Sequence, residues 1–171
     1  MTGVLLVGGA STRFGSPKAL VPLHGRTLAE RAWDTLGFCE ERLAVGKAAD
    51  GLELPFPLLD DGTDVRAPIA GVVAALRAAR NDLAVVLPVD TPRVERDTLV
   101  ALVDACRDAA VPQTGPLPGA YRRSALPVLE RRLAAGGLSL RDALDELHVS
   151  IVRIDPVLLV NVNTADDLAR L

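Results

Sequence analysis

The chain has 171 residues, of which 49% are hydrophobic and 24% are charged, and its formal net charge is −3. This length predicts one domain over residues 1–171, and the composition excludes a disordered chain. The acidic balance and the 3% of aromatic residues argue against a nucleic-acid partner, because phosphate neutralisation needs basic residues and base stacking needs aromatic ones.

Short aliphatic runs alternate with amphipathic stretches along the chain, which is typical of an α/β protein. The first predicted strand is Val4–Val7, whose apolar side chains on both faces indicate a central place in a parallel sheet. A helix over Leu28–Leu36 follows, in which Thr27 and Glu30 form a capping box and Gly37 suits the exit. Two further short strands are expected at Arg42–Val45 and Phe56–Leu59.

The middle of the chain continues this alternation. Pro68 suits the first turn of a helix that runs through Ala70–Ala79. Leu83–Pro88 is the clearest strand, and the chain is expected to bend directly after it at Asp90-Thr91-Pro92. The next expected elements are a helix near Thr98–Ala109 and a strand near Ala110–Pro112.

The last part of the chain begins with a predicted loop at Thr114–Gly119, and Tyr121 lies in a short strand beyond it. A helix over Ser124–Ala135 is expected to end at Gly136-Gly137. The remaining predicted elements are a helix from Ser139 to Leu147, a strand over Val149–Ile154, and a terminal helix that begins at Thr164 with Asp167 as its capping partner.

Together these elements predict a three-layer α/β/α sandwich with a mostly parallel, Rossmann-like central sheet of about five to seven strands. Open sheets of this kind bind ligands beyond the carboxyl ends of their strands. The loops at residues 8–18, 60–68 and 88–92 follow predicted strands, so they are the candidate site.

Cys39 and Cys106 lie far apart, so the sequence predicts neither a disulfide framework nor a CxxC metal site. The first nine residues have no basic start, and their apolar run is too short for a signal peptide or a membrane span. We therefore expect a cytoplasmic protein with no membrane partner.

Residues 8–18 read Gly-Gly-Ala-Ser-Thr-Arg-Phe-Gly-Ser-Pro-Lys and follow the first strand directly. Small residues let backbone N–H groups approach an anion, while Arg13 and Lys18 add positive charge. The spacing is neither that of a Walker A loop nor that of the Gly-x-Gly-x-x-Gly dinucleotide fingerprint. The segment therefore predicts a phosphate-binding loop of another kind, and the alternative is a surface loop with incidental charges.

Residues 6–18, Leu6-Val7-Gly8-Gly9-x-Ser11-x-Arg13-x-Gly15-x-x-Lys18, resemble the signature of the MobA-like nucleotidyltransferase family. Residues 19–28 and 117–123 also have counterparts in that family. Four more segments resemble its motifs in the same order: Ala67-Pro68-Ile69-Ala70-Gly71, Pro88-Val89-Asp90-Thr91-Pro92, Ser139-Leu140-Arg141 and Asn161-Val162-Asn163-Thr164. The ordered motifs span the chain from Gly3 to its C-terminus, so coincidence is a poor explanation.

The resemblance implies a Mg²⁺-dependent enzyme that transfers GMP from GTP to molybdopterin and releases pyrophosphate. Its implied catalytic residues are Arg13, Lys18 and Asp90. Asp90 follows a buried strand and is the implied Mg²⁺ ligand, and capping of the turn before Pro92 is a compatible alternative role. The implied nucleotide-binding residues are Leu6, Val7, Gly8, Gly9, Ser11, Lys18 and Asp90, together with Asp60 or Asp61.

Asp60 and Asp61 follow a short predicted strand, where the family has one nucleotide-contacting aspartate. Counting back from Pro68 without a gap selects Asp60, a one-residue gap selects Asp61, and a solvated acidic pair is the other interpretation. The family's asparagine after the second strand is absent from residues 45–47, Val-Gly-Lys. Val7 also departs from the family's alanine, whereas Gly8 favours GTP over CTP by resemblance.

For the acceptor, the resemblance implies contacts from Asn161 and Asn163 to a pterin, and from Arg122 to a substrate phosphate. Turn formation beside Thr164 is the alternative role of the asparagines, and a solvated charge is that of the arginine. Proteins of molybdenum-cofactor biosynthesis, or acceptor proteins, are further implied partners. Two other functions stay open: a related transferase that uses CTP or GTP on another phosphorylated acceptor, and a module that binds nucleotide without turnover.

Overall fold

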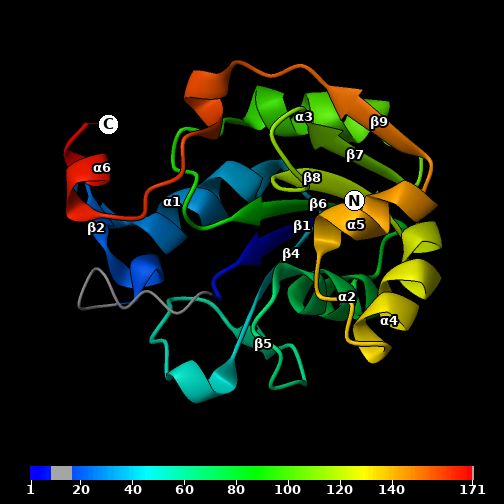
Figure 1. Cartoon of the computed structure of the whole chain (residues 1–171). Coiled ribbons are helices and arrows are strands. Elements are labelled where there is room, and N and C mark those ends of the chain that lie inside the picture. Colours follow the sequence, from blue (N-terminus) through cyan, green and yellow to red (C-terminus); the bar gives the residue numbers. More distant parts are fainter. Residues whose placement is uncertain (9–16, 171) are drawn as a thin grey trace.

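The computed structural model describes residues 1–8 and 17–170, which form a central sheet with helices on both faces (Figure 1). The strands of this seven-stranded sheet lie in the order β5-β4-β1-β6-β8-β7-β9. Their bounds are β1 Thr2–Leu6, β4 Glu41–Gly46, β5 Leu58–Asp60, β6 Leu83–Pro88, β7 Ala109–Pro112, β8 Gly119–Arg122 and β9 Val149–Val152. Only β8 runs antiparallel to its neighbours among these strands, so the predicted mostly parallel α/β/α sandwich is confirmed.

Two hydrophobic clusters, one on each face of the sheet, hold the helices in place. α1 (Leu28–Thr35) and α3 (Arg96–Ala105) pack on the face that presents Leu5 and Leu87. The other face presents Val4 and Val86, and it is covered by α2 (Pro68–Ala78), α4 (Leu126–Ala134) and α5 (Leu140–Ala143). Because side chains alternate along a strand, neighbouring residues of β1 and β6 enter opposite layers, which explains why Val4–Leu6 of β1 and all of β6 are apolar.

The helix starts follow the predicted capping. Thr27 Oγ1 accepts a hydrogen bond from the Glu30 N–H (3.1 Å), and the Thr27 N–H donates to the Glu30 carboxylate (2.8 Å). Thr164 and Asp167 form the same reciprocal box at the start of α6 (Ala165–Ala169). These contacts span only three residues, so the local sequence is enough to specify them.

Two predicted helices end four residues before their expected last residue. The helix expected to reach Ala109 ends at Ala105, because Ala109 and Ala110 enter β7 and are completely buried between β8 and β9. Alanine favours a helix locally, but pairing within the sheet decides its conformation here. The helix expected from Ser139 to Leu147 is α5 followed by a 3₁₀ turn at Leu144–Glu146.

A small hairpin between β1 and α1 was not predicted as a pair of strands. β2 (Pro22–Leu23) pairs with β3 (Arg26–Thr27) through His24 and Gly25, whose φ angles are 50° and 79°. A two-residue turn with positive φ at both central positions matches the right-handed twist of the strands that it joins. Gly37, predicted as the exit of α1, lies within a 3₁₀ turn at Leu36–Phe38.

None of the helices in the described part of the chain combines the length and the apolar character that a membrane crossing requires. Cys39 and Cys106 are both free thiols. Burial raises the pKa of each to about 11, so both remain protonated near neutral pH.

Candidate active site

The candidate site lies along one edge of the sheet, where the carboxyl ends of four parallel strands meet. The backbone hydrogen bonds continue just beyond the strands at this edge: the Val7 N–H donates to the Val45 carbonyl, and the Val89 N–H donates to the Leu6 carbonyl (both 3.0 Å). Gly8 therefore follows β1 between the ends of β4 and β6, and Asp90 follows β6. This is the edge at which open α/β sheets bind their ligands.

A cluster of three predicted residues, Lys18, Asp90 and Asn163, forms at this edge. Lys18 Nζ donates to Asp90 Oδ2 (3.2 Å) and to Asn163 Oδ1 (2.6 Å). The Val162 N–H donates to the Asp90 backbone carbonyl (2.8 Å), which holds the C-terminal segment against the end of β6. Three segments distant in the sequence thus place an ammonium, a carboxylate and an amide in contact.

This cluster is accessible to a ligand. The side chains of Lys18 and Asp90 are 17% and 25% exposed. Within residues 1–8 and 17–170, no group of three His, Cys, Asp or Glu side chains could hold a metal ion by itself. A single carboxylate such as Asp90 nevertheless fits Mg²⁺, which is usually held by one or two carboxylates together with substrate phosphates and water.

The nucleotide side of the predicted site is described only in part. Gly9, Ser11 and Arg13 lie outside the described residues, whereas Leu6 and Val7 are buried and Gly8 is exposed. The two departures from the family pattern contact each other, because a Cβ built on Gly46 would lie 2.8 Å from Val7 Cγ2. The larger side chain at position 7 therefore requires glycine at the end of β4.

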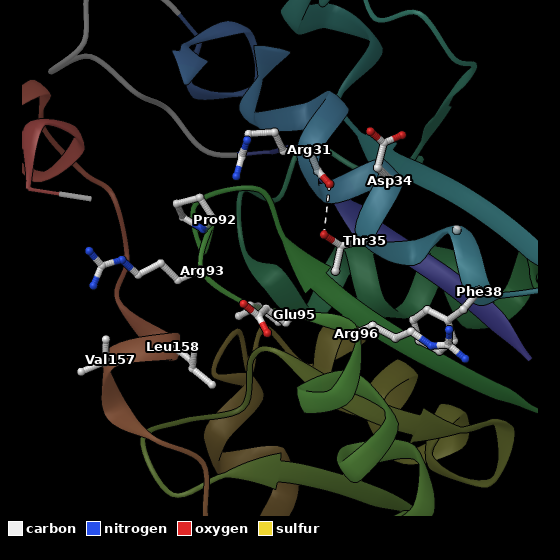
Figure 2. A pocket seen from close by; sticks show the side chains of 12 residues that line it. Arg31, Asp34, Thr35, Phe38, Pro92, Arg93, Glu95, Arg96, Val157 and Leu158 are labelled. Carbon is white, nitrogen blue, oxygen red and sulfur yellow. Dashed lines mark hydrogen bonds between the residues drawn. The ribbon is translucent and has the colours of Figure 1, made fainter. Parts of the chain in front are cut away.

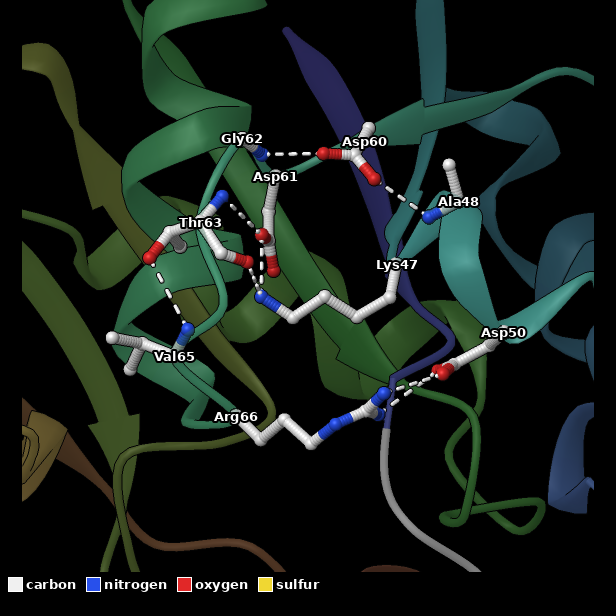
Figure 3. A network of polar contacts seen from close by, with 9 residues as sticks. All are labelled: Lys47, Ala48, Asp50, Asp60, Asp61, Gly62, Thr63, Val65 and Arg66. Atoms are coloured by element: carbon white, nitrogen blue, oxygen red, sulfur yellow. Dashed lines mark hydrogen bonds and ion pairs between the residues drawn. The ribbon is translucent and has the colours of Figure 1, made fainter.

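Asp60 and Asp61 have different environments (Figure 3). The Asp61 carboxylate is 7% exposed and forms an ion pair with Lys47 Nζ (2.6 Å). Asp60 is exposed, and its oxygens accept hydrogen bonds from the N–H groups of Ala48 (2.6 Å) and Gly62 (2.7 Å). These two bonds, that from Ala48 first, lower the pKa of Asp60. Of the pair, only Asp60 presents an ionised carboxylate that a ligand can reach.

The structure does not bring Arg122, the predicted acceptor-site arginine, to the cluster of Lys18, Asp90 and Asn163. β8 is antiparallel to β6, so Arg122 at the end of β8 stands opposite Leu83 at the start of β6. Its guanidinium forms an ion pair with Asp82 (3.0 Å) at the edge of the sheet opposite Asp90. By contrast, Asn161 is exposed in the same segment as Asn163.

A groove of about 800 Å³ was not predicted (Figure 2). It runs between α1 and residues 92–96, beginning two residues after Asp90, and its volume is within the usual range for small-molecule sites. Within the described residues, the buried Nε of Arg31 in its wall has no hydrogen-bond partner. The only sequence signal for this groove is the spacing of Arg31, Asp34 and Thr35 on one face of α1.

The sandwich and the polar cluster at its strand ends fit a nucleotidyltransferase, and the comparisons with known proteins show that class. The chain belongs to the MobA-like NTP transferase family, whose domain matches residues 3–151. The resemblance seen in the sequence motifs is therefore confirmed.

Relatives of this family are similar over nearly their whole length. A probable molybdenum cofactor guanylyltransferase of Bacillus subtilis (strain 168) is 33% identical over 97% of this chain and 92% of its own. The molybdenum cofactor guanylyltransferase of Desulfosudis oleivorans is 30% identical, with 99% and 93% covered. The solved structure of molybdopterin-guanine dinucleotide biosynthesis protein A from Archaeoglobus fulgidus has a TM-score of 0.84 at 29% identity, with 99% and 96% covered.

Proposed function

We propose that this nucleotidyltransferase transfers GMP from GTP to molybdopterin in a Mg²⁺-dependent reaction that releases pyrophosphate. The observation that carries the proposal is the contact of Lys18 with both Asp90 and Asn163 at the carboxyl edge of the sheet. The names of the relatives that match over nearly the whole chain support the choice of GTP and molybdopterin.

In this reaction a phosphate oxygen of the acceptor attacks the α-phosphorus of GTP, and the bond from that phosphorus to the bridging oxygen breaks as pyrophosphate leaves. The nucleophile is already an anion, so the protein has to align two negatively charged partners rather than remove a proton. Lys18 contributes a cation that offsets the charge of the phosphates. Asp90 would hold Mg²⁺, which when bound would offset the negative charge that develops on the leaving pyrophosphate.

The remaining residues divide between the two substrates. On the nucleotide side, the backbone around Leu6, Val7 and Gly8 lies beside the base, and Asp60 accepts hydrogen bonds from it. An ionised carboxylate only accepts, so it suits the N–H groups of a guanine edge. On the acceptor side, Asn163 and Asn161 provide amides for a pterin. Gly9, Ser11 and Arg13 stay predicted contacts of the triphosphate.

The test is a pyrophosphate-release assay with molybdopterin and Mg²⁺, in which GTP, CTP and ATP are compared, together with calorimetric binding of each nucleotide. We expect release with GTP only, and formation of the guanine dinucleotide product. Release with CTP would replace the proposal by a related cytidylyl transfer. GTP binding without release would indicate a nucleotide-binding module.

A further inference from the structure

The ion pair between Lys47 and Asp61 is the most enclosed one at the strand ends described. Their side chains are 9% and 7% exposed, and Lys47 Nζ donates both to Asp61 Oδ1 (2.6 Å) and to the carbonyl of Thr63 (Figure 3). Lys47 directly follows β4, and the Asp61 N–H extends the pairing of β4 with β5 by donating to the Gly46 carbonyl (3.0 Å). The pair therefore joins the end of β4 to the loop that leads into α2.

The pair shapes the turn at residues 61–63. Asp61 Oδ1 accepts a second hydrogen bond from the Thr63 N–H (3.2 Å), so Lys47 and Asp61 together hold both the N–H and the carbonyl of Thr63. Gly62, which lies between Asp61 and Thr63, has a φ of 72°, a conformation that glycine adopts without strain. The turn is thus specified by one buried cation, one buried anion and one glycine.

The turn at residues 61–63 also orients the Asp60 carboxylate. The Gly62 N–H donates to Asp60 Oδ1, and the Ala48 N–H donates to Asp60 Oδ2 (2.7 and 2.6 Å). Gly62 belongs to the turn that the pair holds, and Ala48 directly follows Lys47. Both donors that fix the Asp60 carboxylate are therefore adjacent to a member of the pair.

We propose that Lys47 and Asp61 are positioning residues, which hold the 61–63 turn against β4 so that the Asp60 carboxylate points toward the base of the bound nucleotide. The inference rests on the proposed function. It assigns a task to a lysine within residues 45–47, the region from which the family's asparagine is absent, and the task is performed through Asp60 rather than by contact with substrate.

Stability alone does not account for a charged pair in this place. Removing two charges from water is costly, and apolar residues of similar volume often replace a buried ion pair without loss of stability. What an apolar pair cannot do is hold the carbonyl and the N–H of Thr63, because these groups need a donor and an acceptor. The pair thus holds the 61–63 turn in one conformation.

The experiment replaces both members at once, Lys47→Met with Asp61→Leu, so that no uncompensated charge stays buried. A matched control, Arg77→Met with Glu130→Leu, removes an exposed ion pair between α2 and α4. The measurements are amide hydrogen exchange over residues 60–66, the Kd and KM for GTP, and kcat. We expect about tenfold faster exchange there and about tenfold higher Kd and KM, with kcat within about twofold, because one charged hydrogen-bonding group is misplaced. The control should leave all four unchanged.

A double-mutant cycle with Asp60→Asn separates positioning from general loosening of the site. If the pair acts through Asp60, adding the two substitutions to Asp60→Asn raises KM little further, because the Asp60 carboxylate through which the pair acts is already absent. Full additivity would overturn the proposal, as would a KM and an exchange rate equal to those of the wild type. If the double variant does not fold, Asp61→Asn takes its place, with at least about threefold higher KM expected. A wild-type protein that fails to bind GTP would instead refute the proposed function.

Discussion

Two lysine-centred clusters stand at the same edge of the sheet and differ in burial and in the origin of their partners. Lys18 reaches Asp90 and Asn163, which are 72 and 145 residues away, and its side chain is 17% exposed. Lys47 reaches Asp61 and Thr63, which are 14 and 16 residues away, and its side chain is 9% exposed.

This difference matches the division that we propose between groups that contact substrate and groups that support them. A partly exposed ion pair contributes little to stability. In the proposed reaction, phosphates would replace Asp90 as the partner of Lys18, and Mg²⁺ would replace Lys18 as the partner of Asp90, both at small cost. The enclosed pair is costly to open because each charge would be left buried without its counterion. The more accessible Lys18 cluster is therefore suited to exchange partners during a reaction, and the enclosed Lys47–Asp61 pair to stay unchanged.

The largest effect on turnover is expected for Asp90→Asn. The amide keeps the shape of the side chain but removes the charge that we propose holds Mg²⁺, so kcat should fall about a thousandfold. The fold should be intact and GTP should still bind. Steady-state kinetics and calorimetry measure these two quantities, and Asp104→Asn on the exposed side of α3 is the matched control. Unchanged kcat would remove Asp90 from the mechanism.

Substitution of each lysine by methionine tests the comparison of the clusters directly. Lys18→Met should lower kcat/KM about a hundredfold while costing less than about 1 kcal/mol of unfolding free energy. Lys47→Met should cost about 3 kcal/mol, because Asp61 is left buried without a counterion. Denaturant unfolding and kinetics on both variants give the measurement. Equal losses of stability would show that the two clusters do not differ as their burial suggests.

A smaller effect is expected for Asp60→Asn, with about tenfold weaker GTP binding. The pKa of Asp60 is lowered. The negative charge that would bind the base is therefore fully present above the usual carboxylate pKa, and it is lost only as the pH falls through the lowered pKa. GTP affinity of the wild type should therefore be nearly constant from about pH 8 to about pH 5, as far as this group determines it. A steep loss of affinity in that interval, traced to Asp60 by its absence in the variant, would contradict this.

The smallest effect is expected for Arg122→Ala. Its guanidinium lies at the opposite edge of the sheet, so kcat and KM should stay within about twofold of the wild type, and an exposed ion pair contributes little to stability. The same kinetic assay measures it. A large rise in KM for molybdopterin would support the acceptor role that the resemblance implies for Arg122.

Local patterns predicted much of the fold. The capping boxes at Thr27 and Thr164 and the apolar runs of β1 and β6 have their causes within a few residues. The end of α3 did not follow from such patterns, because Ala109 is a good helix former that sheet pairing draws into β7. The short hairpin at residues 22–27 was not predicted because each of its strands is only two residues long.

The sequence predicted those site residues that directly follow parallel strands, because the carboxyl ends of parallel strands lie close together. Asp90 follows a clear parallel strand, so its place at the carboxyl edge follows from the pattern alone. Arg122 lies at the opposite edge from Asp90 because β8, in which it is the last residue, runs antiparallel to β6. The Lys47–Asp61 pair could not be foreseen, since neither residue type favours burial unless a partner is present.

By itself the sequence determined the alternating α/β architecture, the helix starts, and the family to which the chain belongs, because periodicity, capping and ordered motifs are properties of neighbouring residues. Only the tertiary structure decided which of two adjacent aspartates is enclosed, which lysine is accessible, and at which edge an arginine lies. These properties depend on strand direction and on burial. Both are set by contacts between segments that are distant in the sequence, and the order of residues along the chain does not specify those contacts.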